Sequence, residues 1–127
     1  MSLRRNALCL VALAWISFAA VSQSPPGFES LPSLSANDLI AKLTGKKFTT
    51  TGTNGTLWSL EYKSNGYLFI SGQGRGGHHN FSKPWRVEDG KICSTDRGVE
   101  ECKPVRLDGS TLVVQMTATE TARYIEH

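Results

Sequence analysis

The sequence has little cysteine and no recognisable catalytic motif. It contains three cysteines, and one of them, Cys9, lies in an apolar segment near the start of the chain. It contains no G-x-S-x-G nucleophile motif, and neither His78 nor His79 has a carboxylate close in sequence. We therefore favour a protein that is not an enzyme and expect no cofactor, although a catalytic set that assembles only in the folded chain stays open.

The chain also lacks an apolar run long enough to span a bilayer comfortably. The apolar segment Ala7–Ala20 follows the basic pair Arg4-Arg5, and Ala20-Val21-Ser22 offers small residues at the −3 and −1 positions of a cleavage site. This series is typical of a signal peptide, with a retained membrane anchor as the alternative. We predict a signal peptide over 1–22, a mature chain from Gln23, a periplasmic or secreted location and no integral membrane segment after cleavage.

Charge of one sign is not in excess. The whole chain has 14 Lys and Arg against 11 Asp and Glu, and removal of Arg4 and Arg5 leaves 12 against 11, a net charge of +1. This balance provides no electrostatic footprint for nucleic acid or for an anionic membrane. We therefore predict that the partner is a protein or an envelope component and not nucleic acid, and the sequence leaves the oligomeric state open.

Cys93 and Cys102 are the two cysteines that remain after the predicted cleavage. Two cysteines in an exported chain are typical of one disulfide. Redox dithiols usually have the spacing C-x-x-C, and a zinc site would need further ligands at suitable spacing. We therefore predict a structural disulfide between Cys93 and Cys102, and no metal site.

The first part of the mature chain predicts a linker followed by a short helix. Residues 23–34 are rich in proline and serine, which indicates a linker or a loosely attached arm before a single domain over 35–127. Ser35 is a predicted N-cap. An apolar stripe predicts a helix over Ala36–Thr44 that packs on something larger, and it consists of Leu39, Ile40 and Leu43.

Beyond Gly45 the pattern is that of short strands separated by turn signals such as Asn65-Gly66 and Asp89-Gly90. We predict a mainly β fold, an antiparallel meander of about eight short strands that forms a small barrel or a curved sheet, with one short N-terminal helix and one disulfide. The expected strand regions are Lys46–Thr53, Leu57–Lys63, Tyr67–Ser71, the hairpin Phe81–Cys93, Lys103–Leu107, Thr111–Thr117 and Ala122–Glu126.

Aromatic residues are expected to form most of the core of so small a domain. Tyr67–Ser71 is apolar at nearly every position, which predicts a central strand covered on both faces. The aromatic side chains that we assign to the core rather than to a ligand stack are Trp58, Tyr62, Tyr67, Phe69, Phe81 and Trp85.

One motif resembles a known group of proteins. The run W-x-V-x-x-G-x-x-C from Trp85 to Cys93, with Cys102 after it, resembles an uncharacterised family of small exported proteobacterial β-sheet proteins. This resemblance implies a periplasmic or secreted β domain with no assigned activity. Ala122-Arg123-Tyr124 is similar to a segment of the β-barrel lysozyme inhibitors of bacterial envelopes, but Glu120-Thr121 stands where Ser-Gly usually precedes it.

The glycine-rich stretch Gly72–Asn80 is the one segment that suggests a binding chemistry. Its backbone could approach a ligand closely, and Arg75, His78 and His79 are the candidate ligand-binding residues. A phosphate loop should open a helix, which this stretch does not, and glycine-rich segments are commonly flexible. We therefore predict an exposed, mobile hairpin loop over Gly72–His79.

Two functions remain open. The favoured one is a small exported binding or interaction module, such as an inhibitor or an envelope-associated protein of unassigned activity. The alternative is a small-ligand carrier or enzyme with a site at the glycine-rich loop. A cavity of several hundred Å³ would favour the alternative, whereas a filled barrel with a flat, exposed apolar patch would favour the interaction module.

Overall fold

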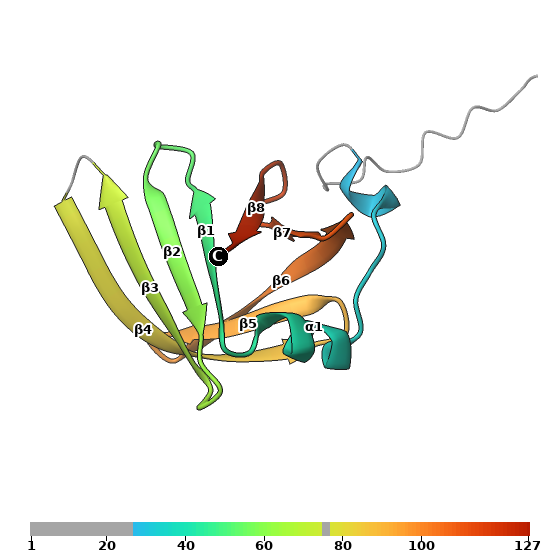
Figure 1. Ribbon diagram of the computed structural model, residues 1–127, viewed down its shortest axis with the longest axis horizontal. Helices are drawn as coiled ribbons and strands as arrows, with labels where there is room; N and C mark the ends of the chain where they lie inside the picture. Colours follow the sequence, from blue (N-terminus) through green and yellow to red (C-terminus); the bar gives the residue numbers. More distant parts are fainter. Residues whose placement is uncertain (1–26, 75–76) are drawn as a thin grey trace, which may run out of the picture.

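The structure is a computed structural model that describes residues 27–74 and 77–127. Its eight strands form a closed antiparallel barrel in which each strand pairs with the next and β8 pairs with β1 (Figure 1). The predicted mainly β meander with one short helix and one disulfide is confirmed, and the sheet is a barrel. The elements are η1 (Phe28–Ser30), α1 (Ala36–Leu43), β1 (Lys46–Thr51), β2 (Leu57–Tyr62), β3 (Tyr67–Gly74), β4 (Gly77–Glu88), β5 (Lys91–Asp96), β6 (Val99–Asp108), β7 (Thr111–Gln115) and β8 (Thr121–Glu126).

Side chains alternate between the inside and the outside of the barrel, as the period of a β-strand requires. In β2, for example, Leu60 and Tyr62 are buried, whereas Glu61 between them is only partly covered. The interior cluster draws on α1 and on seven strands, and the partly buried Trp85 and Val87 of β4 pack against it, so one core holds the domain together. Its buried members are Leu34, Leu39, Leu43, Phe48, Leu60, Tyr62, Leu68, Ile70, Ile92, Val105, Leu112, Val114 and Tyr124.

Helix α1 packs against β4 and β1, at the end of the barrel opposite the β1–β2 loop (Figure 1). The predicted N-cap is confirmed, because the Ser35 hydroxyl accepts a hydrogen bond from the Asp38 N–H at 3.1 Å. Leu39 and Leu43 are fully buried, but Ile40 is exposed. The helix therefore uses a narrower apolar stripe than the sequence indicated and closes one end of the core.

The described part of the expected linker, residues 27–34, packs closely against the barrel. Phe28 and Leu34 are buried. The Leu107 N–H donates to the Pro32 carbonyl at 3.0 Å, and the Gly90 N–H donates to the Leu34 carbonyl at 2.7 Å. Residues 27–34 are therefore not a loosely attached arm, because backbone hydrogen bonds and two buried side chains fix them. Residues 1–26, which include the predicted signal peptide, lie outside the described residues.

The glycine-rich stretch is not a long loop. Strands β3 and β4 continue through it in regular register, with Gly72 opposite His79 and Gly74 opposite Gly77. Residues 75–76 lie outside the described residues. The prediction of a loop over Gly72–His79 is therefore wrong over the described positions, because cross-strand pairing with a neighbouring hairpin strand holds glycines that the sequence alone marks as unconstrained.

Strand β3 is covered on one face only. Leu68 and Ile70 are buried inside the barrel, whereas Tyr67 and Phe69 on its outer face are 47% and 41% exposed. The prediction of a strand covered on both faces is wrong, because the outer surface of the barrel faces solvent here. Three further assignments to the core also change: Phe81 is exposed, and Trp58 and Trp85 are only partly buried, although both pack against the core.

The predicted disulfide is present. Cys93 and Cys102 stand directly opposite each other on β5 and β6, and their sulfur atoms are bonded at 2.04 Å. Cys93 is fully buried. None of the helices in residues 27–74 and 77–127 has the length and apolar character needed to cross a membrane.

Candidate functional site: the barrel cavity

The barrel interior is not completely filled. A cavity of about 200 Å³ lies among side chains from all eight strands and reaches the surface beside Phe81 and Met116, which are exposed. Its wall is mainly apolar. The lining residues are Thr50, Trp58, Leu60, Tyr62, Leu68, Ile70, Phe81, Lys83, Ile92, Ser94, Lys103, Val114, Met116 and Tyr124.

Two buried tyrosines form part of the deep wall. Tyr62 and Tyr124 are both buried, and their hydroxyl groups interact with each other within the core. Burial raises the pKa of Tyr124, and it raises the pKa of Tyr62 well above its usual value with a further contribution from Tyr124. The rings of Phe48 and Trp85 pack against Tyr62 edge-on, with centroids 6.0 and 5.1 Å away. The deep wall is therefore neutral and held by aromatic packing.

Trp58 and Phe81 contribute aromatic surface to the cavity. Their rings meet edge-on with centroids 6.4 Å apart. The Trp58 indole lies over Gly72, and a Cβ atom at that glycine would stand only 2.5 Å from an indole carbon. Gly72 is therefore required for the close approach of Trp58 to the β3 backbone, rather than for flexibility of a loop.

The charged residues of the lining are two lysines, Lys83 on β4 and Lys103 on β6. The Lys103 ammonium lies 3.2 Å from the Glu101 carboxylate and donates a hydrogen bond to the Met116 carbonyl at 3.4 Å. Lys83 is half-buried between Phe81 and Trp85 on the inner face of β4, and it has no hydrogen bond or ion pair with another described residue. The cavity thus combines an apolar wall with one cation, Lys83, that no described residue pairs.

The residues singled out from the sequence lie elsewhere. His78 and His79 are exposed at the start of β4, opposite Gln73 and Gly72. They are not part of the cavity lining, and Arg75 lies outside the described residues. A ligand-binding role for these three residues stays a prediction. The sequence does carry a signal for Lys83, because Lys83 alternates in step with Phe81 and Trp85 and so shares their inward face.

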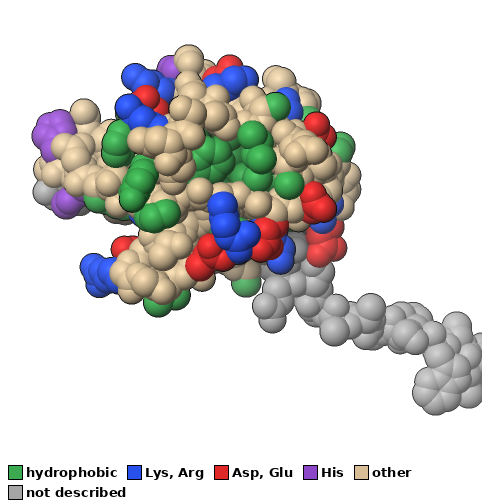
Figure 2. All heavy atoms as spheres, turned by 90° about the horizontal axis from the view of Figure 1, so that it is seen from below, with side chains coloured by type: hydrophobic (Ala, Val, Ile, Leu, Met, Phe, Trp, Pro, Cys, Tyr) green, Lys and Arg blue, Asp and Glu red, His purple; other side chains and the backbone are tan. Residues whose placement is uncertain are grey.

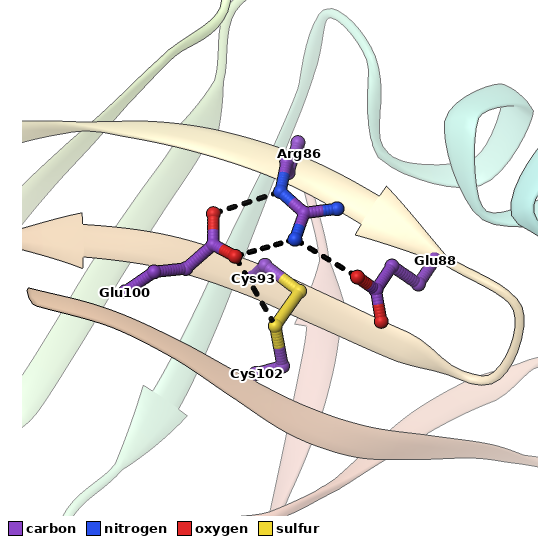
Figure 3. The surroundings of a disulfide bond; sticks show 5 residues. All are labelled: Arg86, Glu88, Cys93, Glu100 and Cys102. Carbon is purple, nitrogen blue, oxygen red and sulfur yellow. Dashed lines mark hydrogen bonds and ion pairs between the residues drawn. A yellow bond between two sulfur atoms is a disulfide. The ribbon is translucent and has the colours of Figure 1, made fainter.

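A second cluster of polar groups surrounds the disulfide on the outer surface (Figure 3). The Arg86 guanidinium makes two hydrogen bonds to the Glu100 carboxylate, one of them at 2.7 Å from Nε, and a third to Glu88 at 2.8 Å. These bonds lower the pKa of Glu100 and raise the pKa of Arg86. The cluster joins β4 to β6 across β5 beside Cys93 and Cys102.

The same cluster brings together three residues of types that can bind metals. Glu88 and the sulfur atoms of Cys93 and Cys102 lie within 4.8 Å of one another. The two sulfurs are bonded to each other, so neither offers the thiolate that binds a metal. The cluster is therefore an ion-pair network around a structural disulfide.

Comparison with known proteins returned no relative. No protein-family model, no curated protein and no solved structure matches the chain. The likeness of the Trp85–Cys93 motif to a family of exported proteins therefore stays a resemblance, and the cavity geometry carries the functional inference.

Proposed function

We propose that the protein is an exported binding protein whose barrel cavity takes a small, mainly apolar ligand. The observation that carries this proposal is the unfilled interior of about 200 Å³, open to solvent at one side. An eight-stranded barrel is wide enough either to be filled by its own side chains or to hold one small ligand. Because an apolar cavity of about 150 Å³ in another protein accepts benzene, this interior has room for a single ring or an alkyl chain.

The outer surface supports a protein-binding role less well. Tyr67 and Phe69 are exposed on β3, but the Lys63 ammonium lies 4.7 Å from the Phe69 ring centroid, and Glu61 pairs with Phe69 across the sheet. Figure 2 shows hydrophobic side chains in the middle of one face with basic and acidic side chains close beside them. The core of a protein interface is usually depleted of charged residues. The cavity is therefore the better candidate site.

The proposed location is the periplasm or the exterior of the cell. The disulfide fits a non-cytoplasmic compartment, because oxidising conditions are needed for structural disulfides to persist. The signal-like series over 1–22 supports export. Intact mass of the protein recovered from a periplasmic extract tests this part: a chain that starts at Gln23 is expected, and a chain that retains 1–22 would contradict it.

A cavity-filling variant tests the binding proposal. Ser94 lines the cavity, whereas Ser82 is exposed on the outer face of β4. We expect the protein to bind 1-octanol saturably, Ser94→Trp to abolish this binding, and Ser82→Trp to retain it. Calorimetry measures the binding, and circular dichroism confirms that both variants are folded. Absence of saturable binding by the unmodified protein, or equal binding by a folded Ser94→Trp variant, would rule the cavity out as the site.

A further inference from the structure

We infer that the ligand of this cavity carries one negatively charged group, a carboxylate on an apolar body, and that Lys83 is the residue that binds it. This inference rests on the proposed function, because it names the chemistry of the ligand that the cavity would hold. We base it on the kind and number of charged side chains that line the cavity.

Lys83 is placed where a bound anion could reach it. It lies on the inner face of β4. Its neighbours on that face are Phe81, which is at the surface, and Trp85, whose ring packs on Tyr62. Its neighbour across the sheet is Leu68, a buried residue of the same cavity. A half-buried ammonium beside apolar surface has lost part of its hydration, so a carboxylate that hydrogen bonds to it would restore favourable interactions.

The charge balance around the cavity favours a single negative charge. Lys103 already has the Glu101 carboxylate at 3.2 Å, whereas Lys83 has no ion pair with a described residue. Asp96, the acidic residue at the end of β5, makes no ion pair with either lysine among the described residues. Two lysines and one engaged carboxylate leave one positive charge, which a singly charged group such as a carboxylate balances.

The rest of the wall fits the apolar body of such a ligand. Most of the remaining lining is formed by aliphatic side chains, among them Leu60, Ile70 and Val114, and by the buried Tyr62 and Tyr124. The lining contains no acidic residue and no basic residue besides Lys83 and Lys103. A charged group buried against those side chains would be unpaired and costly, so the anionic end of the ligand is expected at Lys83, with its alkyl or aryl part against the apolar wall.

Three probes of the same length separate this inference from the proposed function. Octanoate, 1-octanol and octylamine share an alkyl chain and differ in charge, and their binding to the mature chain is measured by calorimetry at neutral pH and low salt. We expect octanoate to bind at least about tenfold more tightly than 1-octanol, the scale of one charge-assisted hydrogen bond, and octylamine to bind most weakly. The preference for octanoate should decrease as salt is added if Lys83 remains accessible to ions.

Variants then identify the responsible cation. Lys83→Met keeps an unbranched apolar side chain and removes the charge, and Lys91→Met removes an exposed charge on β5 as the matched control. We expect Lys83→Met to reduce the octanoate preference to near unity while 1-octanol binding is retained, and Lys91→Met to change neither. If all three probes bind equally to the unmodified protein, or if Lys83→Met keeps the preference, the inference is wrong while the cavity proposal stands. If none of the probes binds, the proposed function itself fails.

Discussion

Arg86 and Glu100 show at the scale of single residues how an exposed ion pair can still be well defined. They lie on β4 and β6 with the disulfide-bonded β5 between them, and the guanidinium contacts both oxygens of the carboxylate. The hydrogen bonds from Arg86 lower the pKa of Glu100. A carboxyl group with a lowered pKa in the folded state stabilises the fold above its usual pKa, and this contribution is lost as the pH falls through the lowered value.

The pair predicts a specific titration behaviour. In Arg86→Gln the pKa of Glu100 should rise toward 4.5, its ordinary value, because the hydrogen-bond donor and the positive charge are both removed. Carboxyl-carbon NMR titration measures this change. Arg123→Gln, which removes a separate ion pair with Asp108, serves as the control and should leave Glu100 unchanged. An unchanged Glu100 titration in Arg86→Gln would show that the bidentate contact is not formed in solution.

Gly72 is a second residue with a measurable effect. A Cβ atom there would collide with the Trp58 ring, so Gly72→Ala must displace an indole that lines the cavity. We expect a loss of about 1–3 kcal/mol in the free energy of unfolding, the usual cost of overpacking, together with a change in tryptophan fluorescence. Urea denaturation gives the first quantity. Gln73→Ala, at the exposed neighbouring position, should change neither, and an equally stable Gly72→Ala variant would contradict the observed packing.

At the scale of elements, the sequence predicted those features that depend on local pattern. Alternation along Trp58–Tyr62, the Asp89-Gly90 turn and the Ser35 cap are each set by a few neighbouring residues, and the structure confirms them. Features that depend on distant residues were not predicted. Residues 27–34 pack because of partners on β6 and in the β4–β5 turn, which no local composition reveals.

The candidate site likewise has one feature that the local sequence pattern predicts and one that depends on the whole fold. The period of β4 already placed Lys83 on one face with Phe81 and Trp85, so the inward lysine could have been found from the sequence. Whether that face borders a cavity or a filled core depends on the summed volume of side chains from eight strands, and a sequence pattern does not give that volume. The glycine-rich stretch drew attention because glycines suggest mobility, whereas Gly72 accommodates Trp58.

The disulfide of the β5–β6 hairpin is expected to stabilise the fold measurably. The disulfide joins two residues that pair directly across the sheet and are separated by nine positions in the sequence. Replacing both cysteines, Cys93→Ala with Cys102→Ala, should lower the free energy of unfolding by about 2–4 kcal/mol, the usual range for a native disulfide. Alanine is chosen because Cys93 is fully buried and a serine would bury a hydroxyl there.

Urea denaturation measures the loss, and reduction of the unmodified protein should produce a loss of the same size. Unchanged stability in both experiments would show that the bond is not formed in the native protein or does not constrain the unfolded chain.

At the scale of the whole molecule, the domain is a closed barrel that is sealed near α1 and hollow toward Phe81 and Met116. A closed barrel has no free sheet edge to offer a partner strand, and its outer apolar residues are interspersed with charges. The interior is therefore the place where the fold concentrates apolar surface that is still accessible. The proposed function requires that a ligand enters this interior.

Methyl NMR spectroscopy tests that claim most directly, with octanoate added stepwise to the mature chain. Ile70, Ile92 and Val114 line the cavity, whereas Val99 and Ile125 are exposed on other parts of the barrel. If octanoate enters the cavity, the cavity methyl signals should shift saturably, with little change at Val99 and Ile125. Shifts confined to the exposed methyl groups, or no saturable shifts at any of the five residues, would contradict the proposed function.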